Sequence, residues 1–78
     1  MGITEERYSR DEDLIKRIGE NVRKYRKLKG LTIEKLSFNS GLGTTSIYEI
    51  EHGKVNTNVT TIQKLCAALE VTANDLFA

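Results

Sequence analysis

The sequence contains no proline and no tryptophan, and aromatic residues make up only 6% of it. Turns and strands of all-β proteins usually recruit proline and aromatic residues, so their scarcity favours an all-helical fold. No apolar run approaches the roughly 20 residues that a membrane-spanning helix needs, and the first residues lack the apolar stretch of a signal peptide. The composition therefore predicts a helical protein without a membrane segment.

Cysteine and histidine occur once each, as Cys66 and His52. One cysteine cannot form an intramolecular disulfide, which favours a reducing compartment such as the cytoplasm. We expect Cys66 to be a small core residue, with a redox switch as the alternative. Metal sites need several ligands, so no metal is expected at His52. The sequence has no paired carboxylates, phosphate-binding loop or nucleophile–base set, and we expect no enzyme, no cofactor and no small-molecule ligand. With only 78 residues, a binding module is favoured.

Charge is unevenly distributed along the chain. The net charge is +1, but residues 1–13 carry two basic and five acidic side chains, whereas residues 14–78 carry ten basic and six acidic ones. Seven of those ten basic residues fall between Lys16 and Lys29. Such a cluster is compatible with phosphate binding, although a solvated helix face is the commoner explanation.

Apolar spacing and capping residues predict five helices in one domain. Apolar residues at steps of three and four, beginning with Ile15, Ile18 and Val22, are typical of one buried helix face. The predicted helices are residues 10–29, 32–39, 43–52, 59–69 and 73–77. Residues 1–9 are interpreted as a tail and residues 10–78 as the domain.

Short polar side chains are predicted to cap these helices. Ser9 and Glu12 have the spacing of a capping box, and Thr32, Asn58 and Thr72 are candidate N-caps. Glycines expected at helix ends are Gly30, Gly41 and Gly53. The predicted apolar stripe of the fourth helix is Val59, Ile62, Leu65, Cys66 and Leu69, and Leu76 or Phe77 is expected to return to the core.

The segment 32–52 reads as a short helix, a glycine-bearing turn and a second short helix. Its apolar residues, which are expected to fix the angle between the two helices, are Leu36, Leu42, Ile47 and Ile50. The side chains left to project outward are Thr44, Thr45, Ser46, Tyr48, Glu49 and His52. The second helix of such a unit can lie in the DNA major groove, although any helical bundle contains short helix pairs.

A further set of residues falls in an order and spacing typical of one family. Its members are Gly19, Val22, Arg23, Arg26, Gly30, Leu31, Thr32, Glu34, Leu36, Gly41, Ile47, Ile50, Glu51, Gly53, Lys54, Asn56 and the run 65–71. With them, residues 18–76 resemble the lambda-repressor/Cro-type helix-turn-helix family, also called the xenobiotic-response-element family. The resemblance implies a five-helix domain that binds double-stranded operator DNA as a homodimer, in the transcription control of bacteria or phages.

The resemblance also implies roles for the outward residues. Those expected at base edges are Thr44, Thr45, Tyr48 and Glu49. Those expected at the DNA backbone are Thr32, Gly43, Ser46, His52, Lys54 and Asn56. Threonine can present its methyl group to thymine, and a carboxylate can accept from a cytosine amino group. The alternatives are helix capping for the two threonines of the third helix, a solvated position for Glu49, packing for Tyr48 and a helix C-terminal position for His52.

Two further expectations follow from the resemblance. Arg26 and Glu51 are expected to form a partly buried salt bridge between the first and third helices, the alternative being two unrelated exposed charges. The dimer surface is expected around the last two helices, with Val71, Leu76 and Phe77 as candidates. The alternative is that these three side chains close the core of the monomer.

Some positions depart from the family pattern. Ile33 stands where a glutamine usually reaches a phosphate, and Val55 replaces a frequent arginine. The predicted surface therefore has no arginine that could bind guanine with two hydrogen bonds. Leu28, Ile33 and Phe38 are apolar where the family is usually polar. A protein-interaction module that binds a partner through these three residues is the alternative function.

Overall fold

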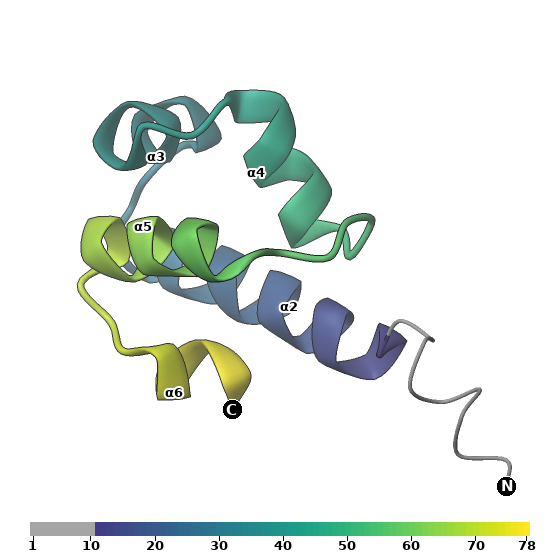
Figure 1. The fold of residues 1–78 in the computed structure, drawn as a ribbon. Coiled ribbons are helices and arrows are strands. Elements are labelled where there is room, and N and C mark those ends of the chain that lie inside the picture. Colours follow the sequence, from purple (N-terminus) through teal and green to yellow (C-terminus); the bar gives the residue numbers. More distant parts are fainter. Residues whose placement is uncertain (1–10) are drawn as a thin grey trace, which may run out of the picture.

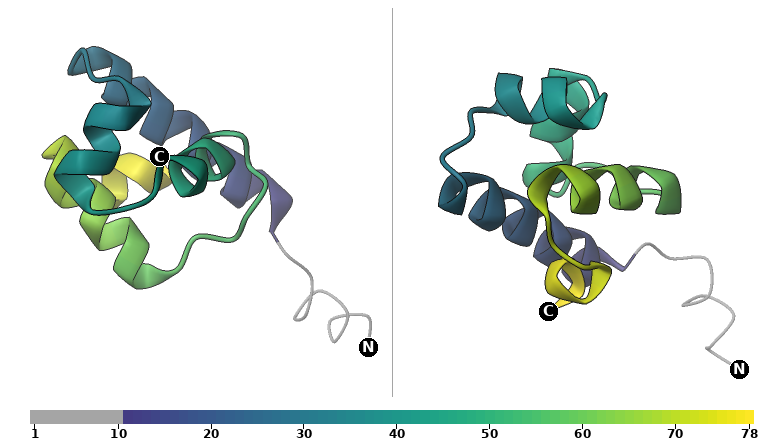
Figure 2. Two further views of the ribbon diagram at one scale, coloured as in Figure 1. Left: turned by 90° about the horizontal axis from the view of Figure 1, so that it is seen from above. Right: turned by 90° about the vertical axis from the view of Figure 1, so that its left-hand side faces the viewer.

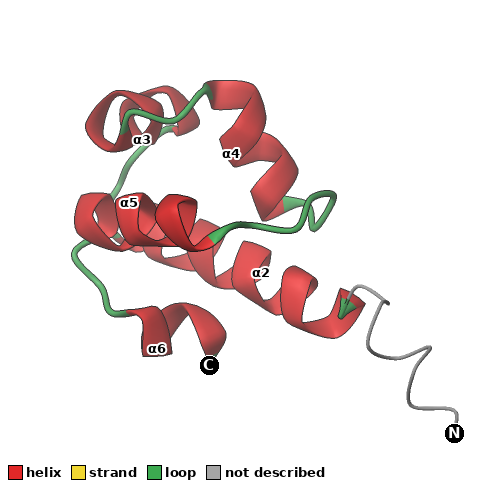
Figure 3. Cartoon of the chain, in the orientation of Figure 1, coloured by secondary structure: helices red, strands yellow, loops and turns green. Residues whose placement is uncertain are grey.

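The computed structural model describes residues 11–78, and within that range every regular element is a helix (Figures 1 and 3). The helices are α2 (Glu12–Leu28), α3 (Ile33–Ser40), α4 (Thr44–Glu51), α5 (Val59–Leu69) and α6 (Ala73–Phe77). They confirm the predicted all-α fold. Each predicted helix is present, and the observed ends differ from the predicted ones by two residues at most.

Helix α2 begins at Glu12 rather than at residue 10. The Asp11 side chain accepts a hydrogen bond of 3.0 Å from the Leu14 amide, which makes Asp11 the N-cap. Glu12 and Asp13 add negative charge to the first turn, where the helix dipole favours it. The capping box predicted for Ser9 and the predicted tail lie outside the described residues.

The other predicted side-chain caps are present. Thr32, Asn58 and Thr72 each accept a hydrogen bond from the backbone amide three residues further on, at 3.0, 2.8 and 3.3 Å. The Asp75 carboxylate accepts a hydrogen bond of 2.9 Å from the Thr72 amide, which completes a capping box at the start of α6. Local sequence therefore determines where α3, α5 and α6 begin.

The helices form three tiers. Helices α3 and α4 lie on one side of the pair α2 and α5, and α6 lies on the other side (Figures 1 and 2). The apolar faces of all five meet in one core, whose buried side chains are Ile18, Val22, Leu36, Ile47, Ile50, Leu65, Leu69 and Leu76. Of the two candidates in α6, Leu76 is therefore the residue that returns to the core.

One residue of the predicted stripe on α5 lies outside the core. Val59 is 81% exposed, whereas Leu65 and Leu69 are at most 2% exposed. Val59 is the first residue of α5 and lies in the turn of the helix that is farthest from the buried Leu65 and Leu69. The prediction that Val59 is a core residue is therefore wrong.

Helices α2 and α4 approach closely at Gly19. A Cβ atom at this position would overlap with the Ile50 carbonyl oxygen and lie 3.0 Å from that of Glu51. The missing side chain therefore lets the end of α4 rest directly on α2. At the other end of the chain, the Asn21 side chain donates to the carbonyl of Leu76 at 2.8 Å and ties α6 to α2, a contact that the sequence analysis missed.

Candidate nucleic-acid interface

The turn between α3 and α4 has the predicted form. Gly41 ends α3 in the left-handed conformation with φ of 77°, which favours glycine because other residues carry a Cβ. The Ser37 hydroxyl donates to the Leu42 carbonyl, and the Leu42 side chain packs against the core. These contacts fix the direction in which α4 leaves the turn.

Buried side chains hold α4 along one face. Ile47 and Ile50 are at most 3% exposed, and Glu51 is 7% exposed. Their spacing of three and four residues places them on the same side of the helix. The helix has only eight residues and no side-chain bond at its Gly43 N-cap, so packing must supply most of its stability.

The residues predicted to meet base edges lie on the remaining faces of α4. Thr44 and Thr45 are exposed, Tyr48 is 46% exposed and Glu49 is half-buried. Thr45 and Glu49 are one helical turn apart and therefore neighbours on the surface. The structure thus gathers these four side chains on the accessible part of one helix.

Two open hollows flank α4. One of about 270 Å³ is lined by Ile33, Glu34, Thr44, Thr45 and Tyr48. The other, of about 190 Å³, lies between α4, the following connection and the start of α5 and is lined by Leu42, Ser46, Glu49, Ile50, Val55, Asn56, Thr57, Asn58 and Thr61. The predicted site residues of α4 are therefore divided between a hollow beside α3 and a hollow beside α5.

Glu49 carries an unpartnered carboxylate. Its backbone carbonyl accepts a hydrogen bond of 2.9 Å from the Lys54 amide, but its side chain has no hydrogen bond or ion pair to any described residue. The other residues that line its hollow are all neutral. The carboxylate is therefore available to a group from outside the chain.

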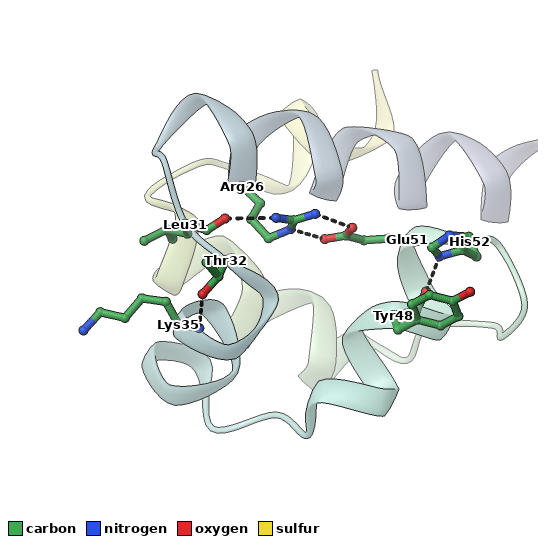
Figure 4. Close-up of polar contacts among 7 residues, drawn as sticks. All are labelled: Arg26, Leu31, Thr32, Lys35, Tyr48, Glu51 and His52. Atoms are coloured by element: carbon green, nitrogen blue, oxygen red, sulfur yellow. Dashed lines mark hydrogen bonds and ion pairs between the residues drawn. The ribbon is translucent and has the colours of Figure 1, made fainter.

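Tyr48 and His52 form a stacked pair at the end of α4 (Figure 4). Their ring centroids are 4.0 Å apart, and His52 Nδ1 lies 2.8 Å from the Tyr48 carbonyl oxygen. Since a carbonyl only accepts, we assign the proton to Nδ1, which leaves Nε2 as an acceptor in the neutral ring. The sequence analysis missed this pair, although the spacing of four residues on a helix would have indicated it.

Arg26 and Glu51 form the ion pair that the family resemblance implied (Figure 4). Arg26 Nε donates to Glu51 Oε2 at 2.6 Å, and Nη2 donates to Oε1 at 3.0 Å. Nη1 also donates to the Leu31 carbonyl at 2.9 Å. The two side chains are 11% and 1% exposed, and the hydrogen bond to Glu51 raises the pKa of Arg26. The pair joins α2 to the end of α4.

The residues predicted to meet the DNA backbone lie before α4, on it and after it. Thr32 is exposed, with its hydroxyl engaged by the Lys35 amide (Figure 4), and Gly43 is exposed at the α4 N-cap. Ser46 is exposed on α4 itself, and His52 is exposed at the α4 C-cap. Lys54 and Asn56 are exposed in the connection to α5.

The three candidates for a dimer surface differ in burial. Leu76 is fully buried in the core of its own chain, so it cannot offer its side chain to a second copy. Val71 is half-buried against the same core. Phe77 is 39% exposed and is the most accessible of the three.

The three apolar residues of the alternative function also differ. Leu28 and Phe38 are 72% and 81% exposed. Ile33 is half-buried, packs against the core and lines the hollow beside Thr44. The structure thus leaves two of the three side chains free for a partner.

Cys66 is half-buried against the core, as expected of a small core residue. Burial raises the pKa of its thiol, and Asp75 adds to the shift, so the reactive thiolate is disfavoured. Across residues 11–78, no cluster of three or more histidine, cysteine, aspartate and glutamate side chains is placed to hold a metal ion. Within the same residues, no helix has the length and apolar character needed to cross a membrane.

The sequence model of a helix-turn-helix family, HTH_3, matches residues 22–76. The chain therefore belongs to this family, which confirms the resemblance and the fold inferred from the sequence. The relatives described below are named as transcriptional regulators or as a controller protein, in agreement with the expectation that the chain is not an enzyme.

Similar proteins come from several bacteria. The HTH-type transcriptional regulator SlrR of Bacillus subtilis is 39% identical over 61 residues, which are 77% of this chain and 40% of SlrR. The regulator y4dJ of Sinorhizobium fredii is 34% identical, with 82% of this chain and 83% of y4dJ covered. The chain thus spans about two fifths of SlrR but most of y4dJ.

A solved structure of high similarity is that of the restriction-modification controller protein C.AhdI from Aeromonas hydrophila. Its TM-score with this chain is 0.78 at 35% sequence identity. The match covers 81% of this chain and 96% of C.AhdI, so the two proteins share nearly the whole helical arrangement.

Proposed function

We propose that this chain is a transcriptional regulator that binds double-stranded DNA at a specific sequence, with α4 in the major groove. The observation that carries the proposal is the division of α4 into two faces. Ile47, Ile50 and Glu51 anchor one face to the body of the molecule, and Thr44, Thr45 and Tyr48 remain accessible on the rest. A rigidly held helix with an accessible polar surface is what groove reading requires.

The proposed contacts divide into two groups. Base edges are contacted by Thr44, Thr45, Tyr48 and Glu49. The sugar–phosphate backbone is contacted by Thr32, Gly43, Ser46, His52, Lys54 and Asn56. Backbone contacts position the helix and supply affinity, and base contacts supply specificity. The exposure of the backbone group on both sides of α4 supports this division.

We further propose that two copies bind a palindromic operator, in the manner of a repressor or controller. Each α4 then enters a major groove about 34 Å from the other, one turn of DNA away. Phe77 and the half-buried Val71 are the candidates for the contact between copies. The bacterial origin of the relatives supports a role in the cytoplasm of a bacterium or in its phages.

A protein-interaction module remains the second candidate function. The exposure of Leu28 and Phe38 favours it, whereas the packing of Ile33 against the core does not. Membership of a helix-turn-helix family of transcriptional regulators favours DNA. A chain that captures a protein partner through Leu28 and Phe38 and binds no duplex would support the second candidate.

Selection from random duplexes tests the proposed function. The expected result is a palindromic motif, with binding that weakens steeply as salt rises because phosphate contacts release counterions. A scrambled duplex of the same composition is the matched control and should bind much more weakly. If no motif is recovered, or if salt leaves the affinity unchanged, the proposal is wrong.

A further inference from the structure

We infer that Glu49 selects cytosine at one position of each half-site. This inference rests on the proposed function, because it takes α4 to lie in the major groove, and it goes further by assigning the base. It follows from the surroundings of one carboxylate and from the hydrogen-bonding groups that bases present in that groove.

Among residues 11–78, no positively charged side chain is paired with the Glu49 carboxylate. It has no hydrogen bond or ion pair to any described residue. The remaining walls of its hollow contain only apolar, hydroxyl and amide side chains. Helix α4 itself carries no lysine or arginine from Thr44 to Glu51. Within the described residues, neither α4 nor the hollow therefore provides a cation that would neutralise this charge when DNA approaches.

An ionised carboxylate only accepts hydrogen bonds, and DNA brings further negative charge close to it. If the carboxylate loses its water at the interface, it must find a donor there or weaken the complex. The donors in the major groove are the N4 amino group of cytosine and the N6 amino group of adenine. In the major groove guanine presents the acceptors O6 and N7, and thymine presents the acceptor O4. Glu49 therefore disfavours both bases.

The neighbouring atom of each base separates cytosine from adenine. Beside its amino group adenine carries N7, an acceptor, which would face the second oxygen of the carboxylate. Cytosine carries a C–H group at the corresponding position, with no lone pair to repel that oxygen. Cytosine is therefore the base that both oxygens of Glu49 tolerate.

The substitution Glu49→Gln gives the inference a directional test. Glutamine has the same length, but it carries one acceptor and one donor. This pair matches N6 and N7 of adenine, with two hydrogen bonds. The variant should therefore exchange a preference for cytosine for a preference for adenine at one position and leave the rest of the motif unchanged.

The experiment compares motifs selected by the wild-type chain, Glu49→Gln and Glu20→Gln. Glu20 is an exposed carboxylate of α2, so its substitution changes the net charge equally but lies outside α4. The wild-type chain and Glu20→Gln should select cytosine at the same position, with a preference of about tenfold over guanine. Glu49→Gln should select adenine there.

A base analogue tests the contact without changing the protein. Replacing the selected cytosine by pyrimidin-2-one removes the N4 amino group and keeps the C–H edge. The wild-type chain should lose about tenfold in affinity, whereas Glu49→Gln should show little dependence on this group.

Three results would overturn the inference. A motif that is the same for wild type and Glu49→Gln would show that Glu49 reads no base, while DNA binding itself would stand. If the wild-type preference that is lost in Glu49→Gln is a preference for guanine or thymine, the inference names the wrong base. The absence of any motif for all three chains would overturn the proposed function as well.

Discussion

Glu51 is the buried charged residue of the described part of the chain, and its side chain is 1% exposed. A buried carboxylate is costly unless it is paired and hydrogen-bonded. Arg26 supplies both the opposite charge and two hydrogen bonds to the Glu51 carboxylate. Its remaining nitrogen, Nη1, donates to the Leu31 carbonyl. The orientation of α4 on α2 therefore depends on this charged pair, on the close contact at Gly19 and on the packing of Ile47 and Ile50 in the core.

The substitution Glu51→Gln should destabilise the fold by about 3–5 kcal/mol, because it leaves the Arg26 charge buried without its partner. Denaturant unfolding of the variant and the wild type measures the difference. Replacing Arg26 and Glu51 together by methionine is the control and should recover much of the loss, since no charge then remains unpaired. A loss below about 1 kcal/mol for Glu51→Gln would mean that the pair behaves like an exposed one.

The ends of α2 and α5 are joined by a different kind of pair. Lys29 follows α2, Glu70 caps α5, and their side chains form an ion pair that is largely exposed on the glutamate side. The hydrogen bond from Lys29 lowers the pKa of Glu70. Because the folded state lowers this pKa, the pair stabilises the fold above the ordinary carboxylate range and stops doing so as the pH falls through the lowered pKa.

The substitution Glu70→Gln should therefore lower stability slightly at neutral pH and have no effect in strong acid. Glutamine keeps the length of the side chain and the left-handed backbone at this position, with φ of 58°, so the comparison isolates the charge. Melting curves across the acid range measure the effect, which should shrink in high salt. Glu20→Gln is the control, because no ion pair joins the Glu20 side chain to another described residue, and an equal loss of stability in that variant would refute the assignment to Lys29.

In the molecule as a whole, the three tiers separate two surfaces. The outer faces of α3 and α4 lie on one side of the α2 and α5 pair, and α6 with the C-terminus lies on the other (Figure 2). The proposed DNA contacts and the proposed contacts between copies therefore fall on different tiers. Each surface can be altered separately by substitution.

For the DNA surface, we expect Lys54→Gln to weaken binding to all duplexes alike and to reduce the salt dependence by one phosphate contact. Lys54 is exposed in the connection that follows α4. Binding titrations at several salt concentrations measure the slope. Lys24→Gln is the control, because Lys24 lies on α2 over the ring of Tyr25. Equal effects of the two substitutions would contradict a specific role for Lys54.

For the surface of α6, two neighbouring residues should behave differently. Leu76→Ala should destabilise the fold by about 2–5 kcal/mol, because it creates a cavity in the core. Phe77→Ala should leave the fold nearly as stable and weaken self-association, since its side chain is 39% exposed. Denaturation and sedimentation at two protein concentrations separate the two effects. If the Phe77→Ala variant still forms dimers as well as the wild type does, the dimer surface does not include Phe77.

The sequence by itself determined where the helices lie along the chain and which face of each helix is apolar. Caps such as Thr32 and Asn58 act on amides three residues away, and apolar spacing follows the helical period, so both are local properties of the chain. The pairing of Arg26 with Glu51 was available only through the family resemblance, because the two residues are 25 positions apart.

Only the tertiary structure decided how exposed each side chain of these helices is and what it contacts. Val59 is apolar but lies beyond the core, Leu76 is buried within its own chain, and Glu49 borders a hollow without a charged partner. Exposure depends on which other helix covers a given face, and that covering element is distant in the sequence. Helical periodicity assigns a side chain to a face, but the packing of the other helices determines whether that face meets solvent, the core or a ligand.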